Sequence, residues 1–322
     1  MRSRILGRTG FQVSEIGFGA WEIGGEQWKG TDDNQSVNAL NLAIDLGLNF
    51  IDTALAYGNG HSEQIIGELL KTRSEKVFVA TKIPPKNRIW PAKRGSKLRD
   101  VFPREYVVDC TQRSLRNLGI DTIDLQQFHV WNDEWADDDE WQEAVQSIRD
   151  QELVKWIGIS MNPHEPWNGI AAAMTGKIDV FQVLFNIFDQ SPTDELFPFC
   201  EKHNLGIIAR VPFDEGSLAG KIAPDTEFEK DDWRNEYFKG DRKDQVYERV
   251  EKLKILLGRE AKTLPELALR YILGFSAVST VIPGLRTVTH VKENLSVSDG
   301  RGLSDTLLAE LKTHRWNRNF YE

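Results

Sequence analysis

Cysteine is nearly absent from this sequence. Only Cys110 and Cys200 occur among the 322 residues, and both fall in segments with the apolar spacing of helices. A disulfide framework or a structural zinc site needs more cysteines at defined spacings, so we expect two reduced thiols. The six histidines form no H-E-x-x-H motif and no Cys/His cluster. The sequence therefore predicts no metal site.

Long hydrophobic runs are also missing. A membrane-spanning helix needs about 20 apolar residues, and one of the longest apolar stretches here, residues 180–188, is interrupted by Gln182 and Asn186. The N-terminus is basic but lacks the apolar segment and cleavage site of a secretory signal. We therefore predict a cytoplasmic protein without a membrane partner.

Positive charge is in deficit, with 40 Lys and Arg against 49 Asp and Glu, a formal net charge of −9. A nucleic-acid backbone would be repelled over most of such a surface, so no nucleic-acid partner is expected. Basic residues gather in 86–99 and acidic residues in 133–140. Each segment is most simply interpreted as a solvated loop.

What the sequence does contain is a repeated order of short apolar run, loop and amphipathic helix. No proline-rich or glycine-serine linker interrupts it, which predicts a single domain over residues 1–322. Short runs rich in Val, Ile and Phe, bounded by glycine or charge, are typical of strands buried on both faces of a parallel sheet. The expected strands are 15–20, 48–52, 77–81, 123–128, 154–159, 180–184, 206–210 and 278–282.

Eight strands that alternate with helices favour a (β/α)8 TIM barrel over an open doubly wound sheet, although periodicity alone leaves the open sheet possible. Residues 4–16 stand outside the rhythm. They predict a hairpin across Gly10 that closes the bottom of the barrel. Residues 211–245 form a long polar insertion after the seventh strand, and long loops in compact domains tend to be functional.

Three helices have recognisable signals. In 105–118, Val108, Thr111, Leu115 and Leu118 share one face, and Gly119 supplies a left-handed stop. Ser62 has the position of an N-cap for 62–70, whose apolar stripe is Ile65, Ile66, Leu69 and Leu70. Thr263 and Glu266 have capping-box spacing at the start of 263–273, with Pro265 in the first turn.

Four reactive residues follow consecutive strands. Asp52 ends the second strand, Tyr57 lies one short loop later, Lys82 follows the third strand and His129 the fourth. In a barrel the active site gathers at the C-terminal ends of the strands, so these side chains should converge.

Their types suit carbonyl reduction. A tyrosine can protonate the alkoxide that hydride delivery leaves, a lysine ammonium lowers the tyrosine pKa, an aspartate keeps the lysine charged, and a histidine can donate to the carbonyl oxygen.

Each of the four also has a structural explanation. Asp52 can cap a turn, Tyr57 can be a packed loop aromatic, Lys82 can be a solvated strand end, and His129 can be a satisfied core histidine. Only the joint placement on neighbouring strand ends favours catalysis.

The segments that carry these residues resemble the aldo-keto reductase family. The opening L-G-R-T-G-F-Q-V-S-E-I-G-F-G-A-W (6–21), the Asp/Tyr segment 49–67, V-F-V-A-T-K (77–82) and the His segment 115–129 are similar to the family's motifs, and the similarity runs to about residue 295. The resemblance implies a TIM barrel that reduces aldehydes or ketones with NADPH. It identifies Asp52, Tyr57, Lys82 and His129 as the catalytic residues.

The resemblance also implies a site for NADPH/NADP. Ser160, Asn162 and Gln182 match positions near the nicotinamide amide, 212–218 the pyrophosphate segment and 281–295 the adenosine-phosphate segment. The implied cofactor-binding residues are Trp21, Ser160, Asn162, Gln182, Arg210, Pro212, Phe213, Asp214, Gly216, Leu218, Gly284, Arg286, His290, Glu293 and Asn294.

Two features of 281–295 favour NADP over NAD. Arg286 can pair with a 2′-phosphate through its planar fork. A helix that begins near Thr287 would aim its N–H groups at that phosphate. Glu293 and Asn294 match positions that hold the adenine.

The chain departs from the family pattern at three points. Met161 is inserted before Asn162, which shifts the register of the asparagine. Arg210 replaces the tyrosine that stacks on the nicotinamide, and a cation there disfavours the oxidised, positive ring. Asp214 replaces a glycine near the pyrophosphate, so we expect its carboxylate to point away.

The substrate is expected to be a small carbonyl compound. The pocket rim should come from Trp21, residues 84–102, residues 130–136 and Phe185. Trp90, Trp131 and Trp135 in those loops fit hydrophobic or planar carbonyls, or else pack the top of the barrel, and the basic loop favours an anionic substrate. Two alternative functions stay open: an NADPH-binding regulatory or sensor subunit, and a Schiff-base enzyme that uses Lys82. The sequence leaves the oligomeric state unknown.

Overall fold

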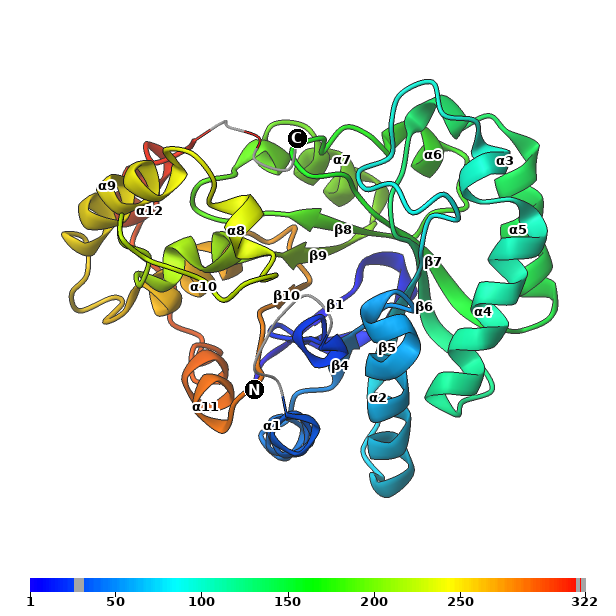
Figure 1. The fold of residues 1–322 in the computed structure, drawn as a ribbon, viewed down its shortest axis with the longest axis horizontal. Coiled ribbons are helices and arrows are strands. Elements are labelled where there is room, and N and C mark those ends of the chain that lie inside the picture. The colour runs from blue at the N-terminus through cyan, green and yellow to red at the C-terminus, as the bar shows by residue number, and fades with distance from the viewer. Residues whose placement is uncertain (26–31, 317–318, 320–322) are drawn as a thin grey trace.

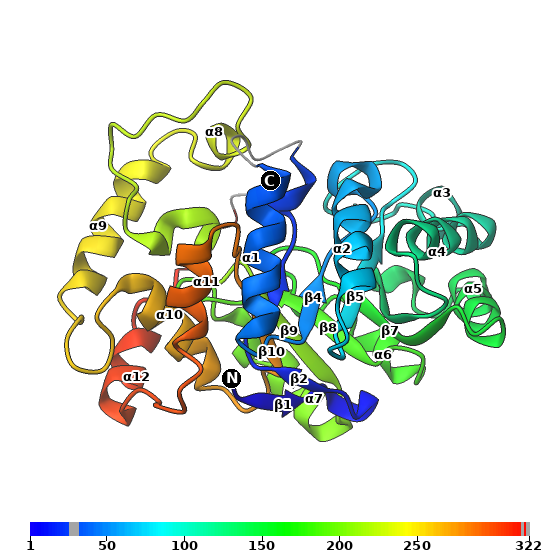
Figure 2. The ribbon, with the colours of Figure 1, turned by 90° about the horizontal axis from the view of Figure 1, so that it is seen from below.

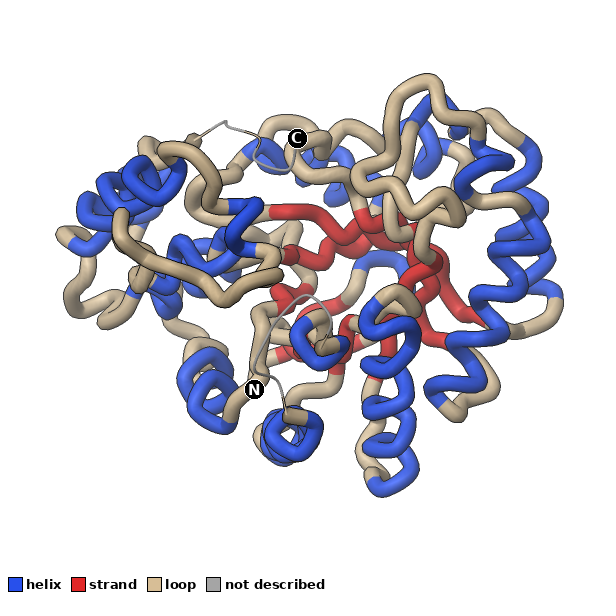
Figure 3. Tube along the Cα trace, in the orientation of Figure 1, coloured by secondary structure: helices blue, strands red, loops and turns tan. Residues whose placement is uncertain are grey.

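The computed structural model describes residues 1–25, 32–316 and 319. In this part of the chain, eight parallel strands follow one another in chain order around a barrel, with helices outside them (Figures 1 and 3). The strands are β3 (Phe18–Gly19), β4 (Phe50–Asp52), β5 (Phe78–Ile83), β6 (Ile123–Phe128), β7 (Val154–Ser160), β8 (Val180–Leu184), β9 (Gly206–Arg210) and β10 (Thr280–Ile282).

The first and last strands meet to close the barrel. Parallel bridges join Ile16 to Val281 and Gly19 to Gly284, and the Gly19 amide donates to the Pro283 carbonyl at 3.1 Å. A Cβ atom on Gly19 would lie 2.9 Å from the Ile282 carbonyl oxygen, so the close approach requires glycine. The predicted (β/α)8 barrel is confirmed.

The helices alternate with the strands and surround them. No helix within the described ranges is long and apolar enough to cross a bilayer. The helices are α1 (Asp33–Asp45), α2 (His61–Thr72), α3 (Leu98–Val101), α4 (Arg104–Leu118), α5 (Asp139–Asp150), α6 (Ile170–Met174), α7 (Leu196–His203), α8 (Arg234–Tyr237), α9 (Arg242–Lys254), α10 (Leu264–Leu273), α11 (Val288–Leu295) and α12 (Asp305–Lys312).

The predicted N-terminal hairpin is present as β1 (Ser3–Ile5) and β2 (Gln12–Ser14), paired antiparallel. Gly10 adopts a left-handed conformation between them, with φ 69°. Leu6 and Val13 are fully buried against a layer of barrel residues that includes Phe50, the first residue of β4. The hairpin therefore closes one end of the barrel, and the segment that carries α8 lies at the other (Figure 2).

The helix signals are partly confirmed. Gly119 ends α4 in a left-handed conformation, and the Thr263 hydroxyl accepts from the Glu266 amide at the start of α10. The expected face of α4 is confirmed at Thr111 and Leu118, which are buried, whereas Val108 and Leu115 are only partly buried and Val107 and Ser114 are buried in addition.

The predicted cap of α2 is wrong. Gly60, with φ 98°, is its N-cap. Ser62 lies inside the helix, where its buried hydroxyl donates to the Ala20 carbonyl at 3.0 Å.

The insertion after β9 is held by buried polar contacts of Asp214 with Tyr237 and Arg242. The insertion 211–245 contains the 3₁₀ segment η6 (Asp214–Ala219), α8 and the start of α9.

Cys110 in α4 and Cys200 in α7 are free and buried. Phe185 is also buried and packs against Phe197, so the expectation that Phe185 forms part of the pocket rim is wrong.

Candidate active site

Four side chains converge at the end of the barrel opposite the hairpin. Asp52 is the last residue of β4, and Lys82 lies one residue before the end of β5. His129 directly follows β6, and Tyr57 opens the short 3₁₀ segment η3 (Tyr57–Gly60) after β4. Because parallel strands present their C-terminal ends at one face of a barrel, residues up to 77 positions apart in the sequence reach one site.

The Lys82 ammonium is the centre of this group. Its Nζ donates to Asp52 Oδ2 at 2.5 Å, to the Thr53 carbonyl at 2.8 Å and to Tyr57 Oη at 3.2 Å. The lysine side chain has no exposed surface. All three N–H groups of the ammonium are thus used, and one of them is directed at the phenol.

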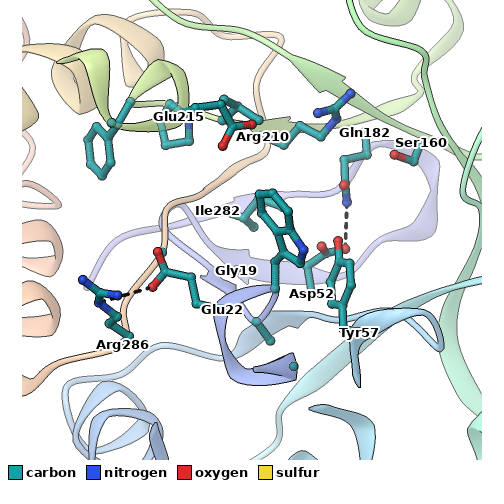
Figure 4. A pocket seen from close by; sticks show the side chains of 18 of the residues that line it. Gly19, Glu22, Asp52, Tyr57, Ser160, Gln182, Arg210, Glu215, Ile282 and Arg286 are labelled. Atoms are coloured by element: carbon teal, nitrogen blue, oxygen red, sulfur yellow. Dashed lines mark hydrogen bonds and ion pairs between the residues drawn. The ribbon is translucent and has the colours of Figure 1, made fainter. Parts of the chain in front are cut away.

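Asp52 is fixed from its other side by two amides. Gln182 Nε2 donates to Asp52 Oδ1 at 2.7 Å, as drawn in Figure 4, and Gln127 Nε2 donates to the same oxygen at 3.1 Å. The resemblance assigned Gln182 to the cofactor amide; in the structure its amide nitrogen is directed at Asp52. Gln127 was missed, although its place in β6 two residues before His129 is a usable signal.

The charges of this cluster follow from its burial. Burial lowers the pKa of Lys82, but the neighbouring Asp52 and Tyr57 raise it more, so the ammonium stays charged. For Tyr57, burial raises the pKa above that of free tyrosine and outweighs the opposing effect of Lys82. Lys82 lowers the Tyr57 pKa, as expected, but desolvation of the phenolate is the larger effect.

His129 is held as a neutral imidazole. Burial lowers its pKa well below the ordinary value, and the nearby Lys82 and Arg210 cations lower it further. Its ring lies edge-on to Tyr57 at 5.8 Å and to Trp90 at 5.9 Å between centroids. The buried Nδ1 has no hydrogen-bond partner among the described residues. A neutral imidazole can donate one N–H to a carbonyl oxygen without carrying charge.

A groove with a volume of about 1650 Å³ opens over the cluster and is lined by Asp52, Tyr57 and His129. Single small-molecule sites are usually about 300–1,000 Å³, so this groove has room for a dinucleotide together with a substrate. Most of the expected cofactor residues line it. These are Trp21, Ser160, Asn162, Gln182, Arg210, Pro212, Phe213, Gly216, Gly284, Arg286, His290, Glu293 and Asn294.

Two expected cofactor residues do not line the groove. Leu218 is fully buried in the core. Asp214 is turned into the protein, where its carboxylate accepts from Tyr237 Oη at 2.8 Å and pairs with Arg242 at 2.9 Å. The expectation that the Asp214 carboxylate points away from the groove is confirmed, and Pro212, Phe213, Glu215 and Gly216 are the residues of 212–218 that line the groove.

The three departures from the family pattern have structural counterparts. Asn162 lines the groove, but its amide nitrogen donates to Glu165 at 2.9 Å and to the Ala92 carbonyl at 3.3 Å, which links two loops. Arg210 Nη2 donates to the Met161 carbonyl at 3.1 Å, and its buried Nε has no partner among the described residues. Arg210 therefore adds a second cation beside Tyr57 and His129.

Glu22 is a residue of the groove that the sequence analysis missed. Its carboxylate lies 3.9 Å from Arg286 Nε (Figure 4), and a Cβ on Gly284 would come within 2.9 Å of it. Burial raises the Glu22 pKa, while Arg286 and Arg234 lower it. Only the position directly after Trp21 could have pointed to it.

The four tryptophans expected at the C-terminal end of the barrel divide into two groups. Trp21 and Trp90 line the groove. Trp131 and Trp135 are buried and pack edge-on at 5.6 Å, so the expectation that they form a pocket wall is wrong. They pack the top of the barrel, the other interpretation of the same residues.

The family model of the aldo/keto reductases matches residues 15–315. The chain is 30% identical over 291 residues to the aldo-keto reductase YhdN of Bacillus subtilis, covering 89% of this chain and 85% of the relative. It is 28% identical to the NADH-specific methylglyoxal reductase of Escherichia coli, covering 97% and 98%. A probable voltage-gated potassium channel subunit beta of Arabidopsis thaliana is 27% identical, covering 93% and 92%.

Among solved structures, the glycerol dehydrogenase AKR11B4 of Gluconobacter oxydans superposes with a TM-score of 0.80 at 27% identity, covering 98% of this chain and 97% of that chain. The aldo-keto reductase AKR11C1 of Bacillus halodurans, in its holo form, superposes with a TM-score of 0.76 at 25% identity over all of both chains. The chain therefore belongs to the aldo/keto reductase family and is an oxidoreductase that acts on carbonyl or alcohol groups.

Proposed function

We propose that this chain reduces aldehydes or ketones to alcohols with NADPH, and that Tyr57 donates the proton. One observation carries the proposal. Lys82 Nζ joins Asp52 at 2.5 Å to Tyr57 at 3.2 Å at the surface of a groove that Tyr57 and His129 line. This is the arrangement that a proton donor to a nascent alkoxide requires.

The raised Tyr57 pKa is compatible with this role. An alkoxide is a far stronger base than a phenolate, so it takes the Tyr57 proton even when burial makes the phenol weakly acidic. The phenolate that remains lies 3.2 Å from the charged Lys82, and Asp52 holds that ammonium in place. The neutral His129 polarises the carbonyl oxygen by donating its N–H.

The nicotinamide cofactor supplies the hydride, and several groove residues fit such a ligand. Gly216, with φ 105°, has open space where a Cβ would stand, so its backbone can approach a pyrophosphate. Arg286 lies at the start of α11, whose N-cap is Thr287, where a phosphate is favoured by the helix N–H groups. Glu293 and Asn294 would hold the adenine.

We infer NADPH rather than NADH from the Arg286 fork, which suits a 2′-phosphate. Replacing Arg286 with Ala is expected to weaken NADPH binding at least tenfold and NADH binding much less, because NADH has no 2′-phosphate. Titration of the protein fluorescence with each nucleotide measures both affinities. Equal losses would remove Arg286 from this role and favour NADH, the cofactor for which the Escherichia coli relative is named.

Two alternatives make different predictions. A regulatory or sensor subunit is suggested by the similarity to a channel subunit, but such a protein does not require Asp52, Lys82 and Tyr57 in hydrogen-bonding order. A Schiff-base enzyme requires a lysine that reaches the substrate. Lys82 has no exposed surface and all its N–H groups are engaged, which disfavours this chemistry.

The test is the Tyr57→Phe substitution. It removes the proton donor but keeps the ring, so kcat for an aldehyde should fall by about 10²–10⁴-fold, while the affinity for NADPH changes less than about threefold. Steady-state NADPH oxidation and fluorescence titration measure the two quantities. Tyr247→Phe, on the exposed side of α9, is the matched control. Full activity in Tyr57→Phe would overturn the proposal.

A further inference from the structure

We propose that the preferred substrates carry an anionic group, a phosphate or a carboxylate, at a distance from the carbonyl, and that Arg88 and Arg113 bind this group. The inference rests on the proposed function, since it names the substrate class of the same site. It is carried by the part of the groove that continues beyond Tyr57 and away from the cofactor residues. We call this part the distal pocket.

The distal pocket is formed by η3 after β4 and by a loop and α4 between β5 and β6. Asn59 of η3, Arg88 and Trp90 of the segment between β5 and α3, and Tyr106 and Arg113 of α4 line it. The expected cofactor residues come from β7 to β10 and from Trp21, on the other side of the catalytic cluster. A substrate whose carbonyl lies at Tyr57 and His129 would therefore extend toward Arg88 and Arg113.

Trp90 forms the wall between the catalytic cluster and the two arginines. Its ring is edge-on to His129, with 5.9 Å between the centroids, and about half of its surface is exposed. An aromatic wall contacts the carbon skeleton of a substrate without offering charge. The chemistry of the distal pocket is thus apolar next to the carbonyl site and cationic at its end.

Both arginines have charge available for a ligand. Neither Arg88 nor Arg113 has an acidic oxygen within 4.0 Å in the described residues, whereas other arginines such as Arg73, Arg149 and Arg270 are paired. Arg113 Nη2 donates one hydrogen bond, to Asn59 Oδ1 at 3.3 Å. The guanidinium has five donors, so most of its donor capacity is left.

Both arginines line the groove together with Tyr106. Burial and Cys110 raise the pKa of Tyr106, and the charges of Arg113 and Arg88 oppose that rise. The carboxylate that Arg113 influences is Glu63. Its oxygens are already bonded to Thr81 at 2.6 Å and Asn117 at 2.8 Å, so Glu63 leaves Arg113 open to another anion.

The segment that carries Arg88 is positively charged, whereas the whole chain is negatively charged. The protein has a formal net charge of −9, yet residues 86–99 contain six Lys or Arg and no Asp or Glu. Arg88 is exposed and Arg113 is partly buried, so a ligand can reach both guanidiniums from solvent, and a guanidinium matches phosphate and carboxylate oxygens in bidentate fashion. A positive rim also steers anions into the site.

The experiment compares charged aldehydes with neutral compounds of the same length. Glyceraldehyde 3-phosphate is paired with glyceraldehyde, and succinic semialdehyde with butanal, each assayed with NADPH. Charge-assisted hydrogen bonds from the two arginines predict a kcat/KM ratio of at least about tenfold in favour of the charged member. A ratio above ten in one pair alone identifies phosphate or carboxylate as the group. The ratio should fall as NaCl is raised.

Arg113→Gln and Arg88→Gln should each reduce that ratio by about tenfold. Arg116→Gln is the matched control, because Arg116 is an exposed arginine of the same helix that does not line the groove, and it should leave the ratio as in the wild type. Equal loss in Arg116→Gln would attribute the effect to net charge and overturn the proposal.

A binding measurement keeps the inference testable apart from turnover. Calorimetry should detect glycerol 3-phosphate but not glycerol at millimolar concentration with the wild-type chain, and weaker binding to Arg113→Gln. If glyceraldehyde and butanal are reduced as fast as their charged partners, the distal pocket does not select anions although the reductase function stands. If no aldehyde is reduced but glycerol 3-phosphate still binds through Arg113, the proposed function fails and the anion site remains.

Discussion

His129 is the residue whose chemistry depends most on being buried. The folded protein lowers its pKa well below the value of 6.5 expected for a free side chain, first by burial and then by the Lys82 and Arg210 charges. A charged imidazole at this position would be repelled by the Lys82 and Arg210 cations. The site is therefore built for the neutral form, which can polarise a carbonyl but cannot supply a formal proton.

The lowered pKa of His129 should make the stability of the protein depend on pH. An unfolded His129 takes up a proton below about pH 6.5 while the folded one does not, so its contribution to stability is present above that pH and is lost as the pH falls. Between pH 7.5 and 5.5 the free energy of unfolding should drop by about 1 kcal/mol more in the wild type than in His129→Gln. Urea titrations at the two pH values measure it. Parallel pH profiles of the two proteins would contradict the assignment.

Arg210 gives a second prediction at this scale. Its cation lowers the pKa of Tyr57 and of His129 and so acts on the catalytic end of the groove. A positive charge there disfavours an oxidised nicotinamide, which is itself positive, relative to the reduced form.

Arg210→Gln should thus lower the ratio of the NADP⁺ to the NADPH dissociation constant several-fold, as measured by fluorescence titration. Arg259→Gln, at an exposed position away from the groove, is the charge-matched control. An unchanged ratio in Arg210→Gln would mean that the guanidinium does not face the ring.

Among the elements, η6 shows how a loop of the groove is held in place. Asp214 of η6 is bonded to Tyr237 of α8 and to Arg242, the first residue of α9. The Arg242 side chain is 1% exposed and that of Asp214 8%, so the pair is buried. This pair anchors the segment that presents Phe213 and Gly216 to the groove.

Breaking the pair should be expensive, because the remaining charge would be buried without a partner. Arg242→Met is expected to cost about 3 kcal/mol of unfolding free energy. Lys71→Met, which removes a pair with Glu68 that is 57% and 75% exposed, should cost less than about 1 kcal/mol. Urea denaturation of both variants is the measurement. Similar costs for the two would show that the Asp214 contact is not an anchor.

The elements also show where sequence reasoning works. The strands and the hairpin could be predicted because a strand buried on both faces appears in the sequence as a short apolar run. β6, β8 and β9 have the predicted bounds. The structure of the insertion could not be predicted from the sequence, because α8 and η6 depend on the contact between Asp214 and Arg242, which lie 28 positions apart. At the site, residue types after strands indicated the four side chains that we propose as catalytic, and the structure brings these four side chains together. Contacts across the barrel, such as Gln182 with Asp52 or Glu22 with Arg286, leave no local pattern.

For the whole molecule, we infer that residues 1–322 unfold as a single domain. Cys110 in α4 and Cys200 in α7 are buried far apart in the sequence, and burial raises the pKa of Cys110 to about 11. Neither thiol should react with a disulfide reagent in the native protein, because the thiolate is the reactive form.

In urea, Cys110→Ser and Cys200→Ser should show the same labelling rate for their remaining thiol, equal to the rate of global unfolding by fluorescence. A much faster rate for one thiol would reveal two separately unfolding parts of the barrel.

The hairpin at the bottom of the barrel has a consequence for how the protein is made. Arg4 donates to the carbonyls of Leu273, Phe275 and Val278, and the Glu15 carbonyl accepts from the Val281 amide. The hairpin segment thus finds these partners only after more than 260 further residues have been synthesised. During translation the growing chain must stay open-ended, with Leu6 and Val13 uncovered, and the barrel can be sealed only when its last strand emerges.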